Sequence, residues 1–181
     1  MHNEKYLTQI SKFLSLVLRH KPETIGIQLD TSGWADVSDL LEKANNHGVK
    51  FDKATLHLVV ETNSKKRFAF NETQDKIRAS QGHSVNVDLG YQNHQPPEIL
   101  YHGTKESAVE SILETGIEKR NRQHVHLSID TETAIKVGQR HGKPVVLKVM
   151  AGQMFRDNYT FFLSANGVWL TDYVPKAYLM R

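Results

Sequence analysis

The stretch "KRFAFNETQDKIRAS", residues 66–80, decides the fold of the N-terminal half of the chain. In residues 66–70 and 76–80, larger apolar side chains recur at every second position, as in half-buried strands. The polar sequence "NETQD" between them is typical of a turn. We therefore predict a β-hairpin at this position.

Three helices are expected before this hairpin. Apolar side chains recur at helical spacing between residues 3 and 20, and a short strand-like run follows at 25–29. Asp36 or Ser38 can cap the start of a second helix, and Asp52 can cap a third. Three short helices followed by a hairpin are the element order of a winged-helix domain.

The C-terminal half has a different pattern. Residues 81–98 lack periodicity and contain a Pro-Pro pair, which indicates a connection between domains. Strand patterns such as 99–104 and 144–149 then alternate with helical ones. The expected class is α+β, with one domain at 1–94 and a mixed α/β domain at 95–181.

Composition limits the possible functions. The 181 residues have a net charge of only +3, so an anion site must be built from a few placed cations. The absence of cysteine excludes disulfides, a thiol nucleophile and cysteine-ligated zinc. No apolar run is long enough to span a bilayer, and no P-loop or GxGxxG motif is present. We expect a cytoplasmic protein without a membrane segment.

Taken singly, the candidate residues have ordinary explanations. Arg19 and His20 precede Pro22 at the end of the first helix, where cations complement the helix dipole. His124 and His126 lie two residues apart, but no acidic cluster completes a metal site around them. We therefore expect no metal.

The order of several short motifs is more specific. These are "LRHKP" (18–22), "KKRF" (65–68), "IRASQGHS" (77–84), "LYHGT" (100–104), "RQHVHLS" (122–128) and "NGVWLT" (166–171). Together they resemble the RNA 2′-phosphotransferase family over nearly the whole chain. The resemblance implies an N-terminal winged-helix lobe and a C-terminal ADP-ribosyltransferase-like lobe that binds NAD, with the active site in the cleft between the lobes.

The resemblance also implies roles for particular residues. The family's catalytic set falls on Arg19, His20, Arg67 and Arg122. Contacts to NAD are implied for His102, Gly103, Thr104 and Ser128. Contacts to the RNA are expected from Arg78, His83 and Ser84.

The reaction implied by the resemblance removes a splice-junction 2′-phosphate from tRNA in two steps. The phosphate first displaces nicotinamide from NAD, and the ribose 2″-hydroxyl then attacks the phosphorus, which releases ADP-ribose 1″,2″-cyclic phosphate. Arginine is suited to the charge that develops on this phosphorus, because it is permanently charged and can fork onto two oxygens. Partners are then 2′-phosphorylated RNA and NAD, with no obligate protein partner.

Two alternatives remain open from the sequence. One is an ADP-ribosyltransferase that modifies nucleic-acid phosphate ends and stops after the first step. The other is a winged-helix regulator that binds nucleic acid, with a second lobe that senses NAD. Val168 stands where protein-modifying relatives of the fold often carry a glutamate, which disfavours modification of proteins.

Overall fold

The computed structural model describes residues 4–181, and the chain divides into two compact units. The first unit ends at Gly90 and the second runs from Tyr91 to Arg181. The predicted boundary at 94/95 lies a few residues inside the second unit. Each unit has its own hydrophobic core. The mixture of helices and strands agrees with the predicted α+β class.

The first unit contains the three helices expected from the sequence. They are α1 (Glu4–Arg19), α2 (Val37–Asn46) and α3 (Lys53–Thr62), with a 3-10 turn at Pro22–Thr24. The Asp36 carboxylate caps α2 by accepting a hydrogen bond from the Asp39 amide, and Asp52 caps α3 in the same way through Thr55. Both predicted caps are confirmed. The predicted first residue of α1, Asn3, lies outside the described residues.

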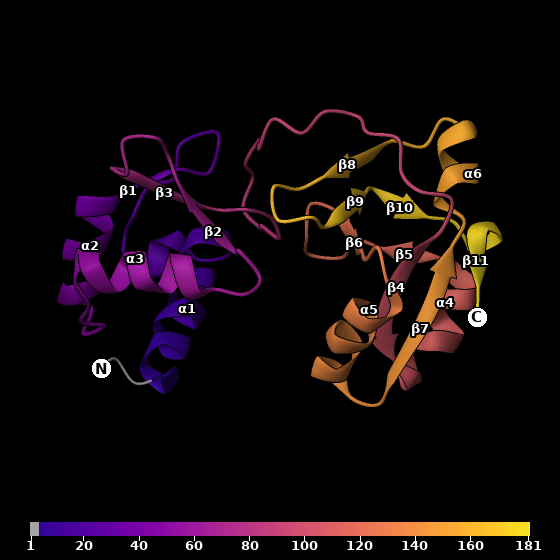
Figure 1. Cartoon of the computed structure of the whole chain (residues 1–181), viewed down its shortest axis with the longest axis horizontal. Coiled ribbons are helices and arrows are strands. Elements are labelled where there is room, and N and C mark those ends of the chain that lie inside the picture. Colours follow the sequence, from indigo (N-terminus) through magenta and orange to yellow (C-terminus); the bar gives the residue numbers. More distant parts are fainter. Residues whose placement is uncertain (1–3) are drawn as a thin grey trace. The chain divides into compact units, whose positions relative to one another are not determined.

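The hairpin at 66–80 is also confirmed. The strands of this unit are β1 (Ala35–Asp36), β2 (Phe68–Phe70) and β3 (Lys76–Ala79). They form an antiparallel sheet in the order β1-β3-β2. The three helices lie on one side of this sheet (Figure 1). Fully buried leucines and Ile77 fill the space between them.

The prediction of a strand at 25–29 is wrong. The Gly26 and Ile27 amides donate to the carbonyl groups of Glu23 and Pro22, so the chain turns there instead of extending. Gly26 has a φ of 71°, which an extended strand does not allow. Ile27 is nevertheless buried. The apolar pattern therefore predicted the burial of Ile27 correctly, but it predicted the wrong backbone conformation.

The second unit contains eight strands and three α-helices. The strands are β4 (Leu100–Lys105), β5 (Ile117–Glu118), β6 (Val125–Leu127), β7 (Pro144–Val149), β8 (Phe161–Leu163), β9 (Trp169–Thr171), β10 (Tyr173–Val174) and β11 (Leu179–Met180). The helices are α4 (Val109–Thr115), α5 (Thr131–Gly138) and α6 (Ala151–Arg156). Helix α6 was not expected from the sequence and is only six residues long.

These strands form three small antiparallel sheets, in the orders β11-β7-β4, β6-β9-β8 and β10-β5. A single bridge between Tyr101 and Ser128 connects β4 to the end of β6. Helix α5 packs beside β4 and β7 (Figure 1). Two glycines permit this close packing, because a Cβ on Gly103 would lie 1.7 Å from the Ala134 carbonyl oxygen and one on Gly138 would lie 2.7 Å from the Thr104 carbonyl oxygen.

Residues 81–98 contain no helix or strand, but they are not a free connection. Val87 is buried, and the Asp88 amide donates to the Thr31 carbonyl group of the first unit. Further along, the His94 amide donates to the carbonyl group of Phe161 in the second unit. Each part of the segment therefore packs on its own unit. No helix within residues 4–181 combines the length and apolar character needed to cross a bilayer.

Candidate functional site

The C-terminal end of α1 is held by the segment that follows β3. The amides of Ser84 and Val85 both donate to the Arg19 carbonyl oxygen, at 2.9 and 3.3 Å. Carbonyl groups in the last turn of a helix lack partners within the helix, so these bonds satisfy one of them. Two of the short motifs, 18–22 and 77–84, are thus brought together although they are far apart in the sequence.

The same contact orients His20. Its Nδ1 lies 2.9 Å from the Ser84 hydroxyl oxygen, and its side chain is exposed. A hydrogen bond at Nδ1 fixes the ring and leaves Nε2 directed elsewhere. Ser84 was predicted to contact RNA, and the structure places its hydroxyl group against His20.

Arg67 directly precedes β2, and its backbone lies close to Arg19. One Nη2–H of Arg19 donates to the Arg67 carbonyl oxygen at 3.5 Å, and the Arg19 guanidinium carbon lies 5.8 Å from the centre of the Phe68 ring. The Ser80 amide donates to the same Arg67 carbonyl at 2.8 Å. The predicted residues Arg19, His20 and Arg67 are therefore gathered at one end of α1 and one end of the hairpin.

His83 is buried beside this group. Its side chain is only 1% exposed, and within the described residues neither ring nitrogen has a hydrogen-bonding partner. The pKa of His83 is lowered from 6.5 to about 4. Burial is the main cause, and the charges of Arg19, His20 and Arg78 contribute to the same shift. The imidazole is therefore neutral at pH 7, and the surroundings carry a positive potential.

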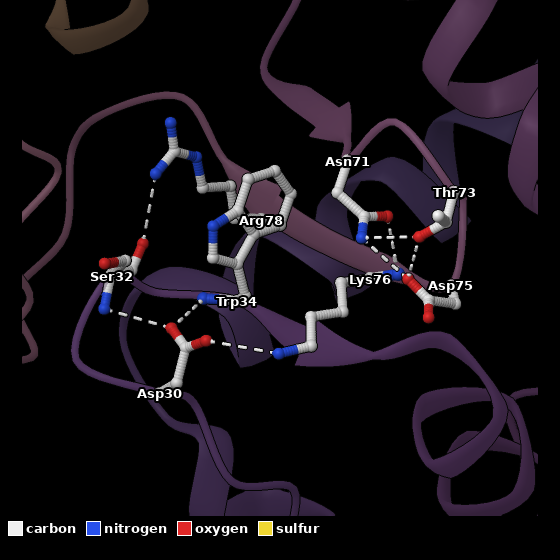
Figure 2. A network of polar contacts seen from close by, with 8 residues as sticks. All are labelled: Asp30, Ser32, Trp34, Asn71, Thr73, Asp75, Lys76 and Arg78. Carbon is white, nitrogen blue, oxygen red and sulfur yellow. Dashed lines mark hydrogen bonds and ion pairs between the residues drawn. The ribbon is translucent and has the colours of Figure 1, made fainter.

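Arg78 projects from the middle of β3 and is held by a loop. Its guanidinium carbon lies 4.4 Å from the centre of the Trp34 ring system, and Nη1 donates to the Ser32 carbonyl oxygen at 3.3 Å. Figure 2 shows this arrangement, together with the Asp30 carboxylate that accepts hydrogen bonds from the Ser32 and Trp34 amides. Trp34 was not among the residues expected from the sequence to be functional. No local pattern in the sequence pairs Trp34 with Arg78, because this pairing depends on the register of β1 against β3.

In the second unit, His102 lies in β4 opposite the end of β6. Its Nδ1–H donates to the His126 carbonyl oxygen at 3.3 Å. Burial lowers the pKa of His102, and the charges of Arg122 and Arg120 lower it as well. The ring is therefore mostly neutral at pH 7, with a lone pair on Nε2. Ser128 is partly buried and pairs through its backbone with Tyr101, the neighbour of His102.

Arg122 lies in the loop that leads into β6. Its Nη1–H donates to His126 Nδ1 at 3.1 Å. Arginine can only donate, so His126 Nδ1 is the acceptor in this hydrogen bond. Partial burial and the charge of Arg140 lower the pKa of Arg122, which nevertheless keeps its proton at neutral pH. His126 was considered only as a metal ligand in the sequence, and here it positions Arg122.

Gly103 and Thr104 have mainly structural surroundings. The position of a Gly103 Cβ is occupied by the backbone of α5, which is sufficient to explain the glycine. The Thr104 side chain is buried at 9% exposure. His102 and Ser128 are partly exposed, so among the four residues predicted to contact NAD these two have side chains that a ligand can reach.

The described residues do not gather three potential metal ligands at one place. His124 contacts aromatic rings, with its ring centre 5.4 Å from that of Phe162 and 6.1 Å from that of Tyr91. Burial lowers the pKa of His124 as well. Its partner in the "HVH" motif, His126, is engaged with Arg122.

The structure therefore defines a two-unit α+β protein in which each unit carries a cluster of arginine and histidine side chains, a combination suited to phosphate groups. Residues 5–173 match the family model described as "RNA 2′-phosphotransferase, Tpt1 / KptA family". The chain belongs to this family, whose members are transferases.

Curated relatives agree over nearly the full length. A "Probable RNA 2′-phosphotransferase" of Flavobacterium johnsoniae is 56% identical over 98% of this chain and 97% of its own. A protein of the same description from Agrobacterium fabrum is 58% identical over 95% of this chain and 92% of its own. Another from Fusobacterium nucleatum is 49% identical over 94% and 96% of the two chains.

Proposed function

We propose that this protein removes the 2′-phosphate from RNA, of the tRNA splice-junction type, by transferring it to NAD. Membership of the RNA 2′-phosphotransferase family supports the removal of the phosphate. The observation that carries the chemical assignment is the gathering of Arg19, His20 and Arg67 where α1 ends and β2 begins. We further propose that NAD is the acceptor of the phosphate and that ADP-ribose 1″,2″-cyclic phosphate is the product.

The cationic residues would act on the phosphate itself. Attack on a phosphorus atom increases the negative charge on its oxygens, and arginine side chains set in advance stabilise that charge. The Arg19 side chain and the Ser80 amide both donate to the Arg67 carbonyl oxygen, which fixes the backbone of Arg67 at the same end of the hairpin. His20, oriented by Ser84, is the group that can hold or move a proton at Nε2. Arg122 of the second unit completes the proposed set.

The residues around β4 fit a dinucleotide. NAD would supply the ribose that accepts the phosphate. The neutral His102 can accept a hydrogen bond from a ribose hydroxyl through Nε2, because Nδ1–H is already used. The charges of Arg122 and Arg120 act on His102, and the charge of Arg140 acts on Arg122. This part of the second unit therefore offers positive charge for a pyrophosphate.

The element order of the first unit supports separate roles for the two units. The first unit has the element order helix, strand, helix, helix and β-hairpin, which is that of a winged helix. We infer that this unit is a winged-helix lobe that binds the RNA, and that the second is an ADP-ribosyltransferase-like lobe that binds NAD.

The test is to incubate the protein with NAD and an oligonucleotide that carries one internal 2′-phosphate. Expected products are the 2′-hydroxyl oligonucleotide, ADP-ribose 1″,2″-cyclic phosphate and nicotinamide, and EDTA should not inhibit. Inorganic phosphate released without consumption of NAD would contradict the proposal. An ADP-ribosyl group that stays on the nucleic acid would favour the end-modifying alternative, and binding without turnover would favour the regulator.

A further inference from the structure

The Trp34–Arg78 pair is a product of the strand register. Ala35 pairs with Ile77 and Asp36 pairs with Lys76 in the antiparallel β1–β3 ladder. Continuing this register by one residue places Trp34 opposite Arg78. Directly opposed residues on one face of an antiparallel pair are close enough for their side chains to contact each other. The indole and guanidinium groups accordingly lie 4.4 Å apart, centre to carbon.

The loop that presents Trp34 is itself well fixed. Asp30 Oδ1 accepts hydrogen bonds from the amides of Ser32 and Trp34, at 3.0 and 2.9 Å. The Asp30 amide in turn donates to the Trp34 carbonyl oxygen, and Lys76 Nζ lies 3.6 Å from Asp30 Oδ2 (Figure 2). The Asp88 amide donates to the Thr31 carbonyl group from outside the loop. The loop therefore supplies a rigid surface for the guanidinium group.

Arg78 is held without being neutralised. Its partners are an aromatic face and the Ser32 carbonyl oxygen, and within residues 4–181 it forms no ion pair. The nearby carboxylate, Asp30, is used by backbone amides and Lys76 instead. One of its five N–H groups is occupied by Ser32, which leaves a fork of donors for an anion. The positive potential that acts on the buried His83 includes Arg78.

We propose that Trp34 is a positioning residue that holds Arg78 for a backbone phosphodiester of the RNA, next to the nucleotide that carries the 2′-phosphate. This inference rests on the proposed function and adds a specific contact to it. A free arginine side chain loses considerable rotamer freedom when it binds a phosphate. Stacking on Trp34 removes that freedom beforehand, so the phosphate contact costs less. A planar fork matches two phosphate oxygens better than a point charge does.

Direct binding tests this contact independently of turnover. Binding of a 2′-phosphorylated oligonucleotide is measured without NAD for the wild type, Trp34→Ala, Trp34→Phe and Arg78→Ala. Arg78→Ala should weaken binding about 10-fold or more and make the slope of log K against log salt shallower by about 0.7. Trp34→Ala should weaken binding about 5-fold. Trp34→Phe, which keeps an aromatic face, should recover most of the loss.

A double variant separates positioning from general damage. Trp34→Ala combined with Arg78→Ala should bind no worse than Arg78→Ala alone, because Trp34 acts through Arg78. Phe70→Ala is the matched control, since it truncates a partly buried aromatic residue of the same sheet that contacts His57 rather than Arg78. It should leave RNA binding and its salt dependence unchanged.

Modified RNA identifies the phosphate. Replacing one flanking phosphodiester at a time by a neutral methylphosphonate should abolish the difference between wild type and Arg78→Ala at one linkage. If every such RNA still distinguishes the two proteins, or the salt slope does not change, Arg78 contacts a base or nothing, and the proposal is refuted. In turnover assays Trp34→Ala should raise KM for RNA with kcat and KM for NAD unchanged. A wild type that binds through Arg78 but does not turn over would refute the proposed function and leave this contact standing.

Discussion

Replacing His83 by leucine should make the stability of the protein less sensitive to acid. Leucine has no titratable group and is similar to histidine in volume. The pKa of His83 is about 4 in the folded protein, because the ring is buried among Arg19, His20 and Arg78, and 6.5 is its ordinary value. The unfolded chain therefore binds a proton at His83 more readily than the folded protein does.

The sign and size of the effect follow from this difference. A folded pKa below the unfolded one means that stability falls as the pH decreases from about 6.5 to about 4, and is unaffected well above 6.5. At 1.36 kcal/mol per pKa unit, the complete loss is about 3 kcal/mol. Between pH 7.5 and pH 5 the wild type should lose about 2 kcal/mol of unfolding free energy through His83 alone.

The assay is urea unfolding of wild type and His83→Leu at pH 7.5 and pH 5, with the change in unfolding free energy compared between the two proteins. His47→Gln, which alters an exposed histidine of the same unit, is the control and should follow the wild type. An NMR titration of His83 reports its protonation directly. Parallel pH dependence of wild type and His83→Leu, or a His83 titration near 6.5, would show that the burial argument is wrong.

Three further outcomes are expected. Ser84→Ala should lower kcat about 10-fold by releasing His20, with KM for NAD unchanged. Ser84→Thr keeps the hydroxyl group and should retain most of the rate. A pH–rate profile of Ser84→Ala that matches the wild type would contradict this role of Ser84. Gly103→Ala should cost roughly 3 kcal/mol of unfolding free energy, measured by urea, since its Cβ would collide with the Ala134 carbonyl group; a loss of activity at unchanged stability would point instead to a ligand contact. Arg67→Ala should slow the attack on phosphorus about 10²-fold or more, so that RNA still carrying ADP-ribose accumulates in a time course; equal slowing of both steps would show that Arg67 has another task.

Local patterns in the sequence determined much of this protein. The caps at Asp36 and Asp52, the first helix and the hairpin at 66–80 all follow from interactions between residues that are close in the chain. The family could likewise be identified from ordered motifs, because those motifs are short and continuous. The prediction of a strand at 25–29 was wrong because a turn buries Ile27. Alternation of apolar and polar side chains does not distinguish a buried turn from a strand.

Contacts between distant segments were decided only by the tertiary structure. The register of β1 against β3 places Trp34 on Arg78, and the segment after β3 brings Ser84 to His20. The same folding buries His83 and changes its charge at acidic pH. The family resemblance implies that Gly103 contacts NAD, and the structure adds a second reason for the glycine, because the backbone of α5 lies against it. Residue type limits what a side chain can do, but which partner it meets depends on packing across the chain, and no local pattern encodes that.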